Sequence, residues 1–157
     1  MFENKVAYIT GGTKGIGFGI AKILLQNGIN VAITGRKKAD VDHAVSQLSP
    51  DSSKVLGIVS DVRNFEEEVQ AVSAIKNHFG RLDYVIANAG LGVFKSVDEL
   101  SVEDWNDMIG TNLSGLFYTL KASMEELKKS EGYFISISSL AGTNFFEKGS
   151  GYNASKF

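Results

Sequence analysis

The chain has 157 residues, with 16 Lys and Arg against 18 Asp and Glu, and a formal net charge of −2 at pH 7. A hydrophobic share of 43% and a charged share of 22% are typical of a globular domain, which excludes a disordered or fibrous protein. The near-neutral charge argues against nucleic-acid partners, and the lack of long apolar runs argues against a membrane span. With no Cys and two His, we expect neither a disulfide nor a metal site.

The first ten residues contain no basic segment followed by an apolar segment, so we expect no export signal and a cytoplasmic location. Glycine is the unusual component, because 17 residues exceed the ordinary share of about 7%.

Predicted strands and helices alternate along the chain. Short apolar, β-branched runs predict strands at residues 5–10, 30–34, 54–60, 82–87 and 132–138. Apolar residues at helical spacing predict helices from residue 16 to a stop at Gly28, over 38–48 with Pro50 closing it, from Asn64 to Gly80, and from Ser101 onward. This alternation predicts an α/β fold whose parallel strands form a doubly wound sheet with helices on both faces.

The helix that starts at Asn64 has an apolar face made by residues 65, 69, 72, 75 and 79. The charge runs at 37–38, 66–68 and 128–129 are interpreted as solvated helix ends without a binding role.

Five glycines crowd the junction between the first strand and the first helix, at positions 11, 12, 15, 17 and 19. Glycine tolerates positive φ and leaves the backbone bare where a pyrophosphate approaches a helix N-terminus. The spacing matches neither the G-x-G-x-x-G pattern nor a P-loop. From these residues alone, a tight turn without a ligand remains the alternative.

The end of the second strand bears on the choice of cofactor. A fold that prefers NAD usually presents an acid there to the ribose 2′-hydroxyl, whereas this chain has Arg36. Arg36 and Lys14 are suited to hold a 2′-phosphate through charge-assisted hydrogen bonds, so NADP is favoured and NAD remains possible. Two exposed surface cations are the alternative interpretation.

Taken together, these residues resemble the short-chain dehydrogenase/reductase family from Lys5 to Phe157. Its glycine signature stands here as Thr10 to Gly17, and its Y-x-x-x-K pair as Tyr152 and Lys156. The resemblance implies a Rossmann-type sheet, with residues 61–62 beside the adenine and 88–90 supporting the cofactor channel. The expected cofactor residues are Gly11, Thr13, Lys14, Gly15, Ile16, Gly17, Arg36, Asp61, Val62, Asn88, Ala89, Gly90, Tyr152 and Lys156.

The expected catalytic residues are Asn112, Ser139, Tyr152 and Lys156. Hydride transfer between a nicotinamide and a carbonyl requires a matching proton transfer at oxygen. Tyrosine ordinarily titrates near 10, so a tyrosine base needs a nearby cation, and Lys156 lies one helical turn beyond Tyr152. The resemblance implies that Lys156 also binds the ribose hydroxyls and that Asn112 holds a water in a proton relay. Ser139 would donate a hydrogen bond to the substrate oxygen.

Each of these residues also has a structural interpretation. Ser139 fits an N-cap, Asn112 a helix kink beside Gly110, and Tyr152 a buried aromatic with a satisfied hydroxyl.

The expected function is an oxidoreductase that transfers hydride between NADP(H) and a carbonyl or secondary alcohol. The alternative is a catalytically silent nucleotide-sensing or interaction module on the same fold. Apolar residues near 91–94 and 145–146 either wall a substrate pocket or pack within loops, and they do not select a substrate.

The family resemblance suggests a homodimer or homotetramer packed through the long helix and the helix of Tyr152. We expect residues 1–157 to form one dinucleotide-binding domain. Because family members run to about 250 residues, we expect this domain to be the N-terminal two-thirds of a longer protein, ending early in the active-site helix.

Overall fold

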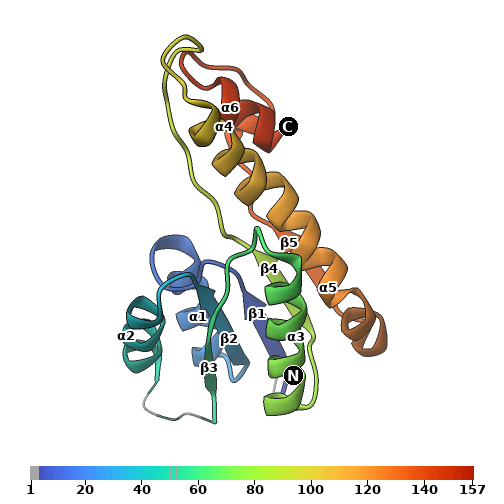
Figure 1. The fold of residues 1–157 in the computed structure, drawn as a ribbon. Coiled ribbons are helices and arrows are strands. Elements are labelled where there is room, and N and C mark those ends of the chain that lie inside the picture. The colour runs from blue at the N-terminus through green and yellow to red at the C-terminus, as the bar shows by residue number, and fades with distance from the viewer. Residues whose placement is uncertain (1–3, 50, 52) are drawn as a thin grey trace.

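The computed structural model describes residues 4–49, 51 and 53–157. The strands in these residues are β1 (Val6–Ile9), β2 (Asn30–Gly35), β3 (Val55–Val59), β4 (Tyr84–Ala87) and β5 (Tyr133–Ser136). They pair in parallel in the order β3-β2-β1-β4-β5 (Figure 1). The predicted doubly wound, Rossmann-type α/β sheet is confirmed. Since the strand order reverses between β1 and β4, their carboxyl ends form the crevice where such folds bind ligands.

Helices cover both faces of the sheet. On one face α1 (Gly15–Gln26) and α2 (Lys38–Leu48) pack on Ala7 and Ile9 of β1. On the other face α3 (Phe65–Phe79) and α5 (Gly115–Ser130) pack on Val6 and Tyr8. Successive residues of a strand point to opposite faces, so β1 is buried throughout at the centre of the core.

Local sequence signals account for several helix ends. The Asn64 side chain accepts hydrogen bonds from the backbone of Glu66 and Glu67 at the start of α3, and Gly80 ends α3 in the left-handed region at φ 80°. Gly28 follows α1 at φ 82°. Helix α2 has its predicted bounds, while Pro50, its predicted terminator, lies outside the described residues.

The predicted long helix is interrupted. Helix α4 (Val102–Ile109) leads into a π-helical turn, η1 (Gly110–Ser114), before α5 continues the same rod. A π-turn contains more residues per turn than an α-helix, and such turns are frequent at functional sites. The loop after β3 packs against Gly110, at the start of this turn, and Gly115, directly after it, so the interruption coincides with a tertiary contact.

The buried stripe of α3 also differs from the predicted one. Val69 is 45% exposed, whereas Glu68 is fully buried. The interpretation of 66–68 as solvated charges is therefore wrong for Glu68. The physical reason is that Tyr8, Ser60 and Thr119 place hydroxyl donors around its carboxyl group.

Beyond β5, a 3₁₀ turn, η2 (Leu140–Gly142), precedes α6 (Ser150–Lys156). In Figure 1, α6 lies beside α4 past the end of the sheet, and the two helices are in contact. Among the helices of the described residues, none is both long and apolar enough to cross a bilayer.

Candidate active site

The glycine turn lies at the carboxyl end of β1 and starts α1. Gly11 and Gly15 have positive φ values of 63° and 58°, which favour glycine. A Cβ on Gly17 would lie 2.5 Å from Asn88 Nδ2, whereas a Cβ on Gly15 would have no neighbour within 4 Å. Gly17 therefore allows close packing behind the turn, and Gly15 leaves backbone open to a ligand.

The loop after β4 is tied to this turn by four hydrogen bonds. The amides of Asn88 and Ala89 each donate to Thr10 Oγ1 at 3.0 Å. Asn88 Nδ2 donates to the carbonyl oxygens of Thr10 at 2.9 Å and Gly11 at 3.1 Å. These bonds join the carboxyl ends of β1 and β4, where the sheet topology predicts a ligand.

A cavity of about 460 Å³ opens at this edge of the sheet. Its lining includes eleven of the predicted cofactor residues, namely Gly11, Thr13, Lys14, Gly15, Ile16, Arg36, Asp61, Val62, Asn88, Ala89 and Gly90. Gly17, Tyr152 and Lys156 are not part of the lining.

Seven further residues line the cavity that were not among the predicted cofactor residues: Thr34, Gly35, Lys37, Asp40, Ser60, Leu91 and Thr111. Five of them lie in β2 or in the loops after β2, β3 and β4, within two residues of a predicted cofactor position: Thr34, Gly35, Lys37, Ser60 and Leu91. That placement is the signal that would have identified them.

The cavity suits an anionic ligand at the start of α1. Lys14, the N-cap residue, makes no side-chain capping bond, and the first turn of α1 contains no acidic residue. Backbone N–H groups at a helix start carry partial positive charge and favour phosphate oxygens. The exposed side chains of Lys14 and Arg36 border the same space. These residues therefore fit the pyrophosphate group of a dinucleotide.

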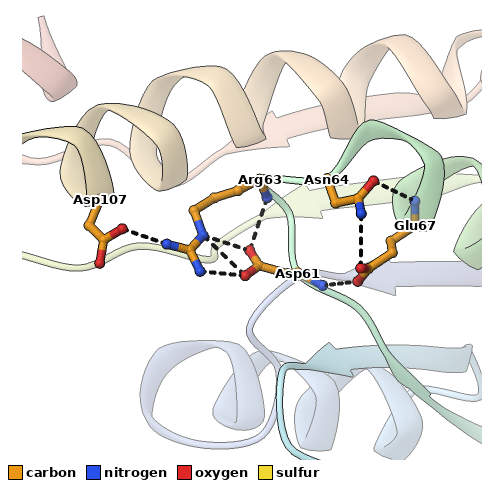
Figure 2. A network of polar contacts seen from close by, with 5 residues as sticks. All are labelled: Asp61, Arg63, Asn64, Glu67 and Asp107. Carbon is orange, nitrogen blue, oxygen red and sulfur yellow. Dashed lines mark hydrogen bonds and ion pairs between the residues drawn. The ribbon is translucent and has the colours of Figure 1, made fainter. Parts of the chain in front are cut away.

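Asp61 is held in place at the side of the cavity formed by the loop after β3. Figure 2 shows Arg63 donating to both Asp61 carboxylate oxygens, with Nη2 2.6 Å from Oδ2. Hydrogen bonding to the Arg63 side chain is the main cause that lowers the pKa of Asp61, since it favours the charged form. The Asp61 amide donates to Glu67 Oε2 at 2.7 Å, which fixes the backbone as well.

Helix α6 places Tyr152 and Lys156 one turn apart. Lys156 Nζ lies 5.9 Å from the centroid of the Tyr152 ring and donates to the Ile137 carbonyl oxygen at 3.1 Å. A Cβ on Gly90 would be 3.8 Å from the same Nζ, so the lysine reaches the loop that lines the cavity. The predicted pair thus lies between the cavity and the loop after β5.

Asn112 is buried in the π-turn η1, and its amide group joins two other segments. Its Oδ1 accepts from the Leu91 amide at 2.9 Å, and its Nδ2 donates to the Leu91 carbonyl at 2.8 Å and to Ser155 Oγ at 2.8 Å. Ser155 belongs to α6, so Asn112 connects the loop after β4 to the helix of Tyr152. The interpretation of Asn112 as part of a kink agrees with η1.

Ser139 caps the 3₁₀ turn η2, where its Oγ accepts from the Ala141 amide at 3.2 Å. The N-cap interpretation is therefore also correct. Because the hydroxyl acts here as an acceptor, its own proton remains available to a ligand.

Aromatic side chains surround the Tyr152 ring. Phe94 lies edge-on to it with ring centroids 5.4 Å apart, and Phe146 lies at 6.5 Å. Phe145 instead stacks on Phe157 and is 83% exposed. Of the apolar loop residues noted in the sequence, Phe94 and Phe146 are thus the two whose rings contact the predicted catalytic tyrosine.

The family and the relatives that match this chain are described as dehydrogenases or oxidoreductases. Residues 5–157 match the family described as short chain dehydrogenase. An uncharacterised oxidoreductase of Staphylococcus aureus is 35% identical over 157 residues, covering 99% of this chain and 67% of the relative. An uncharacterised oxidoreductase of Staphylococcus saprophyticus is 33% identical over 156 residues, covering 98% of this chain and 67% of the relative.

Two solved structures share the fold. An alcohol dehydrogenase from the archaeon Thermococcus sibiricus, complexed with 5-hydroxy-NADP, has a TM-score of 0.91 and 35% identity, covering 97% of this chain and 65% of that one. A putative short-chain dehydrogenase from Novosphingobium aromaticivorans has a TM-score of 0.92 and 29% identity, covering 99% and 61%. The chain spans about two-thirds of the length of these relatives. Its sequence, its sheet order and these matches place the chain in the short-chain dehydrogenase/reductase family of oxidoreductases.

Proposed function

We propose that the chain is the cofactor-binding and catalytic part of an oxidoreductase that interconverts a carbonyl and a secondary alcohol with NADP(H). The observation that carries this proposal is the position of Lys156, whose Nζ lies 5.9 Å from the Tyr152 ring centroid and 3.8 Å from the Cβ position of Gly90 at the glycine cavity. Bound NADP(H) would supply or accept the hydride.

Tyr152 transfers the proton to or from the substrate oxygen. The Lys156 ammonium group lies beside Gly90 and binds the ribose hydroxyls of the cofactor there. Ser139 donates its hydroxyl proton to the same substrate oxygen and stabilises the charge that develops there.

Asn112 holds α6 against the loop after β4 through Ser155 and Leu91. The relay water that the family resemblance implies is assigned to this residue. Its buried position suits a residue that fixes the position of α6 relative to the cavity.

The test is substitution of the proton donor. Tyr152→Phe removes the hydroxyl while keeping the ring that packs on Phe94, so turnover should fall at least about 100-fold while NADPH affinity stays within about twofold. Tyr133→Phe, on the exposed side of β5, is the matched control. The assay follows NADPH consumption with a panel of carbonyl compounds.

Turnover retained in Tyr152→Phe would overturn the catalytic assignment. A wild-type protein that binds NADPH but reduces no carbonyl in the panel would instead support the silent nucleotide-binding module.

The choice of NADP over NAD is supported by two cations that border the cavity, Lys14 at the start of α1 and Arg36 after the end of β2. Asp40, an acid on α2, lines the same cavity and opposes part of this charge. Arg36→Ala should weaken NADP binding at least about fivefold and leave NAD binding unchanged. Lys22→Ala, an exposed lysine of α1 outside the cavity lining, is the control. Equal affinity of the wild-type protein for both cofactors would refute the preference.

A homodimer or homotetramer is supported by the apolar side chains that α4, η1 and α5 expose, which include Trp105, Leu113 and Phe117. Light scattering on the purified protein measures the mass directly, and a monomer at micromolar concentration would contradict this assembly.

A further inference from the structure

The loop after β3 does more than border the cavity. Arg63 uses Nε and Nη2, on one edge of its planar guanidinium group, to hold the Asp61 carboxylate, which leaves Nη1 on another edge. Nη1 donates to Asp107 Oδ1 at 2.5 Å (Figure 2). Asp107 belongs to α4, so one side chain joins the cavity wall to a helix 44 residues further along the chain.

The same loop packs on both ends of the π-turn that follows α4. A Cβ on Gly110 would lie 3.4 Å from Arg63 Cδ, and a Cβ on Gly115 would lie 2.7 Å from Val62 Cγ2. The lack of a side chain at Gly115 is therefore needed for the approach of Val62, whereas the contact of Arg63 with Gly110 is an ordinary van der Waals contact. These contacts connect the loop physically to the turn.

From the turn, the connection continues to the helix of the catalytic pair. Asn112 is hydrogen-bonded to Ser155 Oγ at 2.8 Å, and Ser155 Oγ donates to the Tyr152 carbonyl at 2.8 Å. Hydrogen bonds therefore join Asp61 to Arg63 and Arg63 to Asp107, the helix backbone leads from Asp107 to Asn112, and hydrogen bonds through Ser155 continue to the Tyr152 carbonyl.

We propose that Arg63 is a positioning residue that connects the adenosine end of the cofactor cavity to the π-turn of Asn112, and through it to α6. Arg63 orients Asp61 for the adenosine half of the ligand and, through Asp107 and Gly110, holds η1 in its π-helical form. The proposal rests on the proposed function, because it takes Asp61 and Val62 as contacts of the adenosine half.

Substitutions on the two sides of the guanidinium group separate these two tasks. Arg63→Met removes both, so KM for NADPH should rise and kcat should fall, each by about fivefold. Asp107→Asn keeps the Arg63–Asp61 pair and weakens only the connection to α4, so kcat should fall by a similar factor while KM stays within about twofold. Arg63→Lys retains the charge without the two-sided geometry and should restore KM more than kcat.

The control is Glu126→Gln, which disrupts another ion pair between elements, that of Lys76 on α3 with Glu126 on α5, at 3.0 Å. It should leave kcat and KM unchanged. If Arg63 had a purely structural role, Arg63→Met and Asp107→Asn would both lower stability. The two variants would then not differ in whether kcat alone or both kcat and KM change.

A second measurement does not depend on turnover. Binding of adenosine 2′,5′-bisphosphate, which has no nicotinamide, should slow hydrogen exchange in residues 108–115 of the wild-type protein. In Asp107→Asn this protection should be lost, while the affinity for the bisphosphate stays within about twofold.

The outcomes separate the two claims. If the bisphosphate does not bind the wild-type protein, the proposed NADP site, with Lys14 and Arg36 at the 2′-phosphate, is wrong. If it binds without protecting residues 108–115, or if Asp107→Asn keeps the wild-type kcat and protection, the positioning role of Arg63 is overturned and the cofactor site stands.

Discussion

The buried carboxyl group of Glu68 leads to a prediction about stability and pH. It accepts hydrogen bonds from Tyr8 at 3.0 and 3.1 Å, from Ser60 at 2.8 Å and from Thr119 at 2.8 Å. Burial is the largest influence on this group, and it raises the pKa of Glu68 even though the hydroxyl donors favour the carboxylate. No Lys or Arg side chain forms a hydrogen bond or ion pair with it among the described residues.

A raised pKa means that the folded protein binds the proton more tightly than the unfolded chain does. The contribution of Glu68 to the free energy of unfolding is therefore complete below the ordinary glutamate pKa, about 4.3. It declines as the pH rises from there to the folded-state pKa. Within that window, the loss is at most about 1.4 kcal/mol per pH unit, the value for one proton.

Glu68→Gln tests this reasoning, because the amide keeps the shape and hydrogen-bonding capacity but does not titrate. We expect the stability difference, wild type minus Glu68→Gln, to decrease as the pH rises above about 4.3 and then to level off. Glu66→Gln, exposed in the same first turn of α3, controls for the change in net charge. Urea unfolding at several pH values, followed by circular dichroism, gives the free energies.

Parallel pH profiles for the wild-type protein and Glu68→Gln would refute the reasoning. They would mean that the folded protein and the unfolded chain bind the Glu68 proton equally.

Two further predictions concern packing and charge. Gly17→Ala places a Cβ 2.5 Å from Asn88 Nδ2 and should cost about 1–3 kcal/mol in thermal unfolding and weaken NADPH binding. Gly19→Ala, whose Cβ has no neighbour within 4 Å, should instead stabilise α1 by about 0.5–1 kcal/mol; equal effects would show that the close approach is unimportant. Burial of Asp83 raises its pKa, but hydrogen bonds from Arg81 and Lys5 outweigh this and leave the pKa lowered. Asp83→Asn should therefore cost about 1–2 kcal/mol at neutral pH. That cost should shrink as the pH falls through the folded-state pKa, and a cost independent of pH would contradict the assignment.

Several features followed from the sequence because their causes are local. The cap at Asn64, the stop at Gly80 and the bounds of α2 depend on residues within one or two helical turns. The same is true of the glycine turn, where positive φ at Gly11 and Gly15 is a property of the backbone itself. The alternation of these elements was sufficient to predict the parallel sheet, because a helix between two strands returns the chain to the same end of the sheet.

Other features were decided only by tertiary structure. The π-turn at Gly110–Ser114 coincides with the approach of Val62 and Arg63, which no pattern within the long helix indicates. The burial of Glu68 in place of Val69 depends on hydroxyl groups from β1, α5 and the loop after β3. The contact between Arg63 and Asp107 joins residues 44 positions apart. Periodicity reports which residues share a face of one helix, but the partners of that face are chosen by the folding of the whole chain.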